Sequence, residues 1–256
     1  MIVGGTPTRV GFAGSTHICS CAIRRINDGI ALARRQNNPY ALALVSGLGA
    51  REYAIQGNFT RSLEASGETV RVSTEFGFRL PKALGTINIA WVRARSGKSD
   101  GWADQIQQEL GEINAQKFLV YRSWNLQLLA EVQALSGSVD KALITVEHAL
   151  QTNPDELLHR PEALRLRGEL RLQSTAGGKA CTELAKRDFR EAIKLARKIA
   201  AKLHELRATT SLERLLDQQG RRKQARKMLS TIYGWFTEGF DTEALKQARS
   251  LLERLG

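Results

Sequence analysis

The sequence has few of the residues that favour disulfide scaffolds, β-sheets or membrane spans. Its 256 residues include only 3 cysteines and 5 prolines, and 6% are aromatic. Three scattered cysteines cannot form a disulfide framework, and no apolar run reaches the roughly 18 residues that a transmembrane helix needs. The N-terminus also lacks the basic flank and apolar run of a signal peptide. We therefore expect a cytoplasmic protein with free thiols and no membrane partner.

The composition that remains favours an all-helical protein with a basic C-terminal half. Hydrophobic residues make up 42% of the chain, enough for a sizeable core, and the shortage of proline suits helices. The formal charge is +12. Residues 160–256 contain 22 Lys and Arg against 12 Asp and Glu, so most of the excess lies there. This asymmetry indicates either a solvated face or a surface for an acidic partner.

Glycines recur at a fixed interval of about forty residues. Gly57, Gly97, Gly137 and Gly177 follow one another at steps of 40, and Gly220 lies 43 further on. Each ends an apolar helical segment, where a left-handed residue is needed and glycine adopts it without steric cost. A second helical segment follows each glycine, so the spacing predicts a series of helical hairpins.

The expected helices alternate between a first and a second member of each hairpin. The first helices are expected at Tyr40–Gln56, Leu80–Ser96, Phe118–Ser136, Pro161–Ser174 and Lys202–Gln219. Their partners are expected at Phe59–Phe76, Gly101–Ala115, Val139–Thr152, Glu183–Ala200 and Arg221–Phe236. A capping helix over Asp241–Leu255, with Asp241 as its N-cap, would cover the last unit.

The hairpin around Gly137 has a regular order of large and small residues. Ala130 and Ala142 fall where two helices of one hairpin cross, and bulky side chains there would push the backbones apart. The large residues Leu126, Leu129 and Val146 fill the space between helices, and Pro154 stops the second helix. This order of large and small residues resembles that of a tetratricopeptide repeat. Gln133 departs from the family's tyrosine, whereas Gly168 keeps a small crossing position in a later unit. These features predict a right-handed α-solenoid of about five such hairpins.

The N-terminal end departs from this pattern. Residues 1–20 have no helical period and are expected to be a poorly ordered lead-in, which leaves residues 21–256 as the repeat domain. Residues 21–38 resemble a second helix without its first partner. We therefore expect the chain to be a fragment of a longer polypeptide.

Groups that could perform catalysis are sparse. The four histidines are far apart, and none lies beside a serine or cysteine in a known nucleophilic arrangement. His17, Cys19 and Cys21 lack a fourth ligand for zinc. The SGKSDG and AGGKAC segments lack the glycine four residues earlier that a phosphate-binding loop requires. We expect no catalytic, metal or cofactor site, and no enzyme activity.

The C-terminal half resembles a second, more specific family. Its segments LLHRPEALRLRGELRL, LRATTSLERLLDQQGRRKQAR and YGWFTEGFDTEALKQARSLLERL are similar to the C-terminal repeat region of bacterial proteins that fuse an adenylate or guanylate cyclase domain to a predicted ATPase. The resemblance implies a regulatory arm for signal transduction that senses a partner and communicates with upstream cyclase and ATPase domains. Those domains are absent from this sequence, so it implies no catalysis here.

Two functions follow from the residues. The first is a protein or peptide interaction module whose first helices line a concave groove. Repeat geometry would direct five side chains into that groove: Arg51, Gln127, Arg165, Glu169 and Arg214. The alternative is a nucleic-acid-binding or transcription-regulatory protein that uses the basic second helices. Its cations would be Arg221, Arg222, Lys223, Arg226, Lys227 and the stripe around Arg190.

Overall fold

The computed structural model describes residues 18–97, 101–115, 121–152, 154–155, 157–174 and 178–255. Within these ranges the chain forms twelve α-helices and no strand. The helices are α1 (Ile18–Arg35), α2 (Pro39–Ile55), α3 (Phe59–Phe76), α4 (Arg79–Arg95), α5 (Trp102–Ala115), α6 (Arg122–Leu135), α7 (Val139–Thr152), α8 (Arg160–Gln173), α9 (Lys179–Lys198), α10 (Lys202–Gln218), α11 (Arg222–Tyr233) and α12 (Glu243–Arg254). The predicted all-helical repeat architecture is confirmed.

The helices pack as consecutive hairpins in two layers. Each helix contacts the next one along the chain, and each even-numbered helix from α2 to α12 also contacts the next even-numbered helix. The odd-numbered helices pack little against one another, although Arg34 of α1 lies 2.8 Å from Glu68 of α3, and they form an outer layer over the even-numbered inner layer. The predicted first helices of the hairpins thus share one surface.

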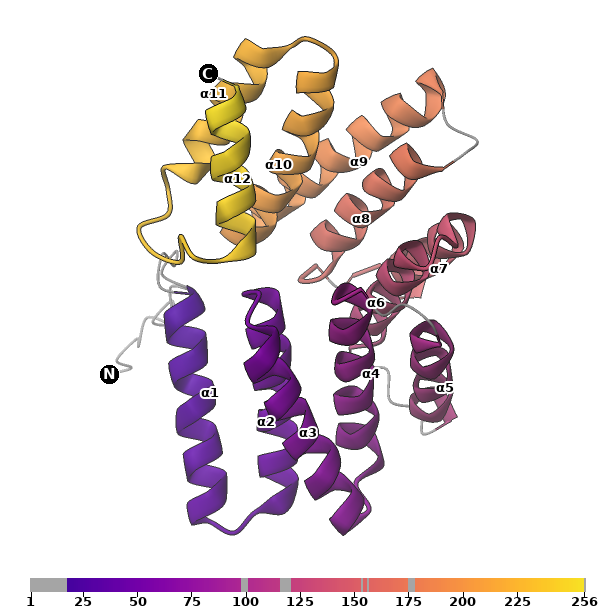
Figure 1. Cartoon of the computed structure of the whole chain (residues 1–256), viewed down its shortest axis with the longest axis vertical. Coiled ribbons are helices and arrows are strands. Elements are labelled where there is room, and N and C mark those ends of the chain that lie inside the picture. Colours follow the sequence, from indigo (N-terminus) through magenta and orange to yellow (C-terminus); the bar gives the residue numbers. More distant parts are fainter. Residues whose placement is uncertain are drawn as a thin grey trace, which may run out of the picture.

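The two ends of this array approach each other. Helix α12 stands above α1 and α2 in Figure 1. At this point a Cβ atom added to Gly57, in the turn after α2, would lie 3.6 Å from the Cβ of Glu243 at the start of α12. The inner layer therefore surrounds a central space to which both ends of the chain contribute.

The glycine spacing corresponds to a repeated helix cap. After α6 the N–H of Gly137 donates to the carbonyl of Ala134, and the N–H of Ser138 donates to that of Gln133, as in a Schellman motif. The φ angles of Gly57, Gly97, Gly137 and Gly220 lie between 76° and 87°. Asn37 and Ala200, with φ of 48° and 57°, take the same left-handed position after α1 and α9, which glycine spacing alone could not predict. Gly177 lies outside the described residues.

Several helix boundaries differ from those expected. Helix α6 begins at Arg122 rather than Phe118, because Tyr121 has a left-handed φ of 62°. Helix α9 begins at Lys179 rather than Glu183 and ends before Ala200. Helix α11 ends at Tyr233 rather than Phe236, because the N–H groups of Trp235 and Phe236 donate to carbonyls three residues earlier and not four.

The N-cap expected at Asp241 is wrong. Thr242 occupies that position, and its hydroxyl donates to the carbonyl of Gly239. At the other end of the chain, residues 18–20 belong to α1. The expected lead-in otherwise falls on residues 1–17, outside the described part. Helix α1 packs against α2.

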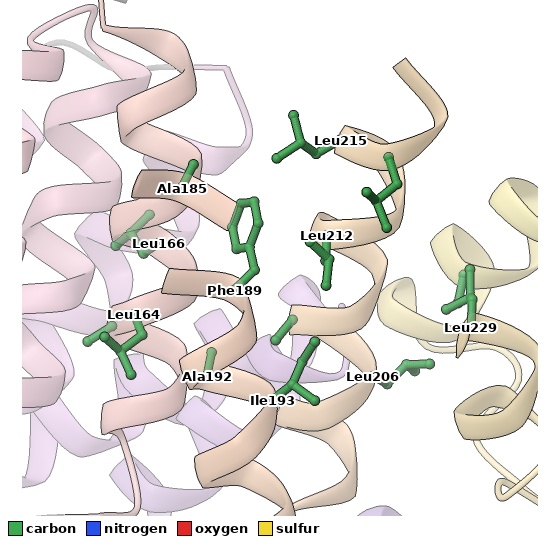
Figure 2. Close-up of a cluster of buried hydrophobic side chains, with 14 of the residues drawn as sticks. Leu164, Leu166, Ala185, Phe189, Ala192, Ile193, Leu206, Leu212, Leu215 and Leu229 are labelled. Carbon is green, nitrogen blue, oxygen red and sulfur yellow. The ribbon is translucent and has the colours of Figure 1, made fainter. Parts of the chain in front are cut away.

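Small residues lie at the hairpin crossings, as expected. Ala130 and Ala142 are fully buried in one core cluster, and Pro154 lies two residues after Thr152, the last residue of α7. A Cβ on Gly168 of α8 would come within 2.5 Å of the Phe189 ring of α9. Figure 2 shows this ring between Leu166 of α8 and Leu212 of α10. The aromatic ring fills space that only a glycine leaves open.

Candidate interaction site

A central cavity of about 80 Å³ lies where the inner helices from the two ends of the array converge. Four arginines and two glutamates contribute to its lining, together with apolar groups from α2 and α4 and hydroxyls from α10. The charged residues are Arg95, Arg165, Arg207, Arg214, Glu169 and Glu243. Because its walls come from α2, α4, α8, α10 and α12, this cavity exists only when both ends of the array meet.

Most charges around the central cavity are paired, either within α8 or between helices. Arg165 donates to the Glu162 carboxylate at 2.6 Å and 2.9 Å, and lies 2.5 Å from Glu169. Arg207 of α10 lies 2.9 Å from the same Glu162 carboxylate, and the Ser211 hydroxyl donates to Glu169 at 2.7 Å. Burial alone would raise the pKa of the Glu162 carboxyl, but Arg165 and Arg207 hold that pKa well below its usual range. This network ties α8 to α10 and keeps the carboxylates ionised.

A second hollow, the inner groove, runs over α2, α4 and α6. Its wall is mainly apolar, with Leu44, Leu48, Leu84 and Leu128 among its lining residues. The Arg51 guanidinium carbon lies 4.8 Å from the ring centroid of Trp124 and 5.2 Å from that of Tyr121, a cation–π arrangement. The groove thus offers an apolar surface beside one cation and two aromatic rings.

The inner groove also holds amide groups with unused hydrogen-bonding capacity. Asn88 of α4 is 4% exposed, and its Nδ2 donates to the hydroxyls of Ser62 and Ser66 on α3 at 2.9 Å and 2.8 Å. The Ser66 hydroxyl donates to the Ser62 carbonyl, so its oxygen must accept from Asn88, which fixes the orientation of the amide. Among the residues that the structure describes, the acceptor Oδ1 of Asn88 and the donor Nδ2 of Asn125 have no hydrogen-bond partner.

The five predicted groove residues all lie on inner helices, but they do not form one site. Arg165, Glu169 and Arg214 meet at the central cavity, where Arg214 donates to Gln247 of α12 at 3.0 Å. Arg51 lines the inner groove. Gln127 is 3% exposed and lines neither hollow. Their role in binding stays a prediction.

Sequence reasoning missed the amides and the aromatic pair of the inner groove. Asn88 and Asn125 lie near the middle and the start of their helices, positions at which asparagine is unfavourable. A polar amide inside an otherwise apolar helical pattern could therefore have indicated these two residues. Their neighbours Tyr121 and Trp124 gave no signal, because aromatic residues at helical spacing usually belong to the core.

Glu213 of α10 is fully buried, and neither of its carboxylate oxygens has a hydrogen-bond partner in the described part of the chain. Burial raises the pKa of this carboxyl to about 8. Since the folded pKa exceeds the unfolded value, the stability that the neutral acid provides is present at acidic pH and is lost as pH rises through about 8.

We expect Glu213→Gln to stabilise the protein at pH 8 and to have little effect near pH 4. The gain at pH 8 should be on the order of 3 kcal/mol, because the variant has no carboxylate to ionise inside the protein. Urea unfolding monitored by circular dichroism at pH 4, 6 and 8 would measure it. The exposed Glu191 provides the control, and an equal response of Glu191→Gln would contradict the assignment.

The described residues contain no group of three or more His, Cys, Asp or Glu side chains arranged to hold a metal ion. His17 and the side chains of Cys19 and Cys21 lie outside the described part. None of the described helices combines the length and the apolar character needed to cross a bilayer.

The inner layer, the outer layer and the repeated caps define a tetratricopeptide-like helical-repeat fold. No protein-family model and no curated protein matches the chain. Among solved structures, apo RapI is similar with a TM-score of 0.58 and 13% identity over 92% of this chain and 78% of that one. The Rap conjugation gene regulator of plasmid pLS20, solved with the Phr* peptide, gives 0.54 and 11% over 100% and 80%.

A third similar structure contains the TPR-like repeats described for a kinesin light chain of Podosopora anserina. It has a TM-score of 0.51 and 14% identity over 74% of this chain and 92% of that one. At these identities the likeness establishes the fold.

Proposed function

We propose that the protein is a non-catalytic interaction module that binds an extended peptide segment of a partner along its inner layer. The observation that carries this proposal is the pair of buried, unpartnered amide atoms in the inner groove, Asn88 Oδ1 and Asn125 Nδ2. An unpaired buried polar atom costs about 1–3 kcal/mol. A peptide main chain offers both an N–H for Asn88 and a carbonyl for Asn125.

The surroundings of these amides suit such a ligand. The leucines of the groove would cover an apolar side chain of the peptide, and Arg51, placed over two rings, would attract a carboxylate or carbonyl oxygen. The similar pLS20 regulator was solved with a peptide, which is in keeping with this use of the fold. In the same proposal, one side chain of the peptide would enter the central cavity beside Arg165, Glu169 and Arg214.

Asn125→Leu is expected to weaken peptide binding about tenfold while leaving the protein as stable as the wild type or more so. The change removes a hydrogen bond that forms only with the ligand, and it also removes a buried donor without a partner. Peptides selected from a random display library on the wild-type protein, then synthesised, would be titrated by isothermal calorimetry. Arg51→Glu should weaken binding at least as much.

The matched control for this experiment is Arg25→Glu on the exposed side of α1, which should bind as the wild type does. Equal affinity of the wild type and Asn125→Leu would contradict the groove. Variants Arg165→Glu and Arg214→Glu test the predicted contribution of the central cavity in the same titration.

We propose further that the partner is a cyclase or ATPase domain of the family that the C-terminal half resembles. This finer proposal rests on the resemblance of Tyr233–Leu255 and the two preceding segments. Separately expressed cyclase and ATPase domains of that family, titrated against the wild type and Asn125→Leu, would test it. Absence of binding to either domain would count against it.

A further inference from the structure

The last hairpin carries an unbalanced group of cations on its outer surface. Lys223, Arg226 and Lys227 lie on α11 at positions i, i+3 and i+4, which places them on one face of the helix. Together with Ser230 and Leu252 of α12 they line a shallow, open hollow of about 560 Å³. All three side chains belong to exposed residues, and no acidic residue contributes to the lining.

This group differs from the other basic residues of the C-terminal half. Arg222, one residue before it, lies 3.0 Å from Asp217, and Arg249 of α12 lies 2.9 Å from Glu253. No such ion pair is found for Lys223, Arg226 or Lys227 among the described residues, and α11 contains no acidic residue. Like charges at this spacing repel one another and lower helix stability. An anionic ligand would remove that repulsion.

We propose that Lys223, Arg226 and Lys227 on α11 form a sequence-independent binding site for the phosphate backbone of a nucleic acid. Neighbouring side chains at this helical spacing have Cβ atoms about 5–6 Å apart, so they can contact successive phosphates of one strand. Phosphate contacts of this kind position a nucleic acid without selecting its sequence. The surface is separate from the inner groove and does not depend on the peptide-binding proposal.

The chemistry of the hollow favours a nucleic acid over an acidic protein. Protein interfaces draw most of their affinity from a few buried aromatic or arginine anchors surrounded by apolar groups. The hollow offers only the partly buried Leu252 as an apolar group, and α11 exposes no aromatic side chain there. Affinity must therefore come from charge, and a duplex provides one phosphate per about 1.7 Å of its axis.

The test is fluorescence anisotropy of the full chain with a labelled 20-base-pair mixed-sequence DNA duplex and a labelled 20-nucleotide oligouridine, between 50 and 200 mM KCl. The triple variant Lys223→Glu/Arg226→Glu/Lys227→Glu should bind the duplex at least tenfold more weakly than the wild type at 50 mM KCl. The slope of log K against log salt should fall in magnitude by about 2–3, because each neutralised phosphate contributes about 0.9.

A control variant tests whether binding depends on this site or on the net charge of the protein alone. Arg24→Glu/Arg25→Glu/Arg35→Glu makes the same charge change on exposed positions of α1. It should weaken binding less than threefold and leave the slope unchanged. Equal weakening by the two triple variants, or no binding of either nucleic acid to the wild type at 50 mM KCl, would overturn the proposal. Tighter binding of poly-glutamate than of both nucleic acids would also overturn it and assign the surface to an acidic protein.

Discussion

Gly168→Ala is expected to lower the free energy of unfolding by about 2–3 kcal/mol, although alanine is the better helix former by about 1 kcal/mol. The new Cβ would stand 2.5 Å from Cε1 and 2.9 Å from Cδ1 of the Phe189 ring. That ring is fully buried and packed against leucines of α8 and α10, so it cannot move away cheaply. Urea unfolding followed by circular dichroism would measure the loss.

The same substitution elsewhere provides the matched control. Gly111 lies inside α5, and a Cβ added there meets no atom within 4 Å. Gly111→Ala should therefore stabilise the protein by about 0.5–1 kcal/mol through helix propensity alone. Phe189→Leu should reduce the cost of Gly168→Ala, because the double variant removes the clashing ring edge. A stabilising Gly168→Ala would show that α8 and α9 cross elsewhere.

Close helix crossings of this kind explain why much of the fold could be predicted from the sequence. The glycine interval identified the turns because local backbone geometry after a helix requires a left-handed φ, which is found at Gly57, Gly97, Gly137 and Gly220. Small residues marked the crossings for a similar reason, since close approach of two backbones restricts side-chain size. The boundaries at Tyr121 and Ala200 were missed because residues other than glycine adopt the same left-handed conformation there.

The candidate sites could be predicted less well, because their geometry depends on contacts between residues about one repeat apart in sequence. Periodicity correctly placed Arg165 and Glu169 on an inner helix, but Ser211, which donates to Glu169, lies 42 residues further on. Trp91 donates to Glu131, 40 residues away. A helical period indicates the face on which a residue lies. The rotation between successive hairpins determines which residues of different repeats meet, and no local pattern encodes that rotation.

Asp188→Ala is expected to lower the free energy of unfolding by about 3–5 kcal/mol, more than any other substitution proposed above. The Asp188 carboxylate of α9 is fully buried and accepts hydrogen bonds from Arg167 at 2.7 Å and 3.2 Å, and also from Arg171. Arg167 in turn donates to Glu147 of α7 at 2.7 Å. Removing the carboxylate would leave two largely buried guanidinium groups of α8 without their shared counter-charge.

Asp188→Ala should therefore lower the free energy of unfolding more than the loss of any single exposed ion pair does. Glu253→Ala breaks the exposed pair with Arg249 and should leave the free energy of unfolding nearly unchanged, because solvent screens such a pair. The two variants would be compared by urea unfolding at pH 7. Replacing Asp188, Arg167 and Arg171 together with leucine or methionine should recover much of the loss, since a buried ion network can be exchanged for apolar packing. An Asp188→Ala variant as stable as Glu253→Ala would mean that α7, α8 and α9 are held together by apolar contacts alone.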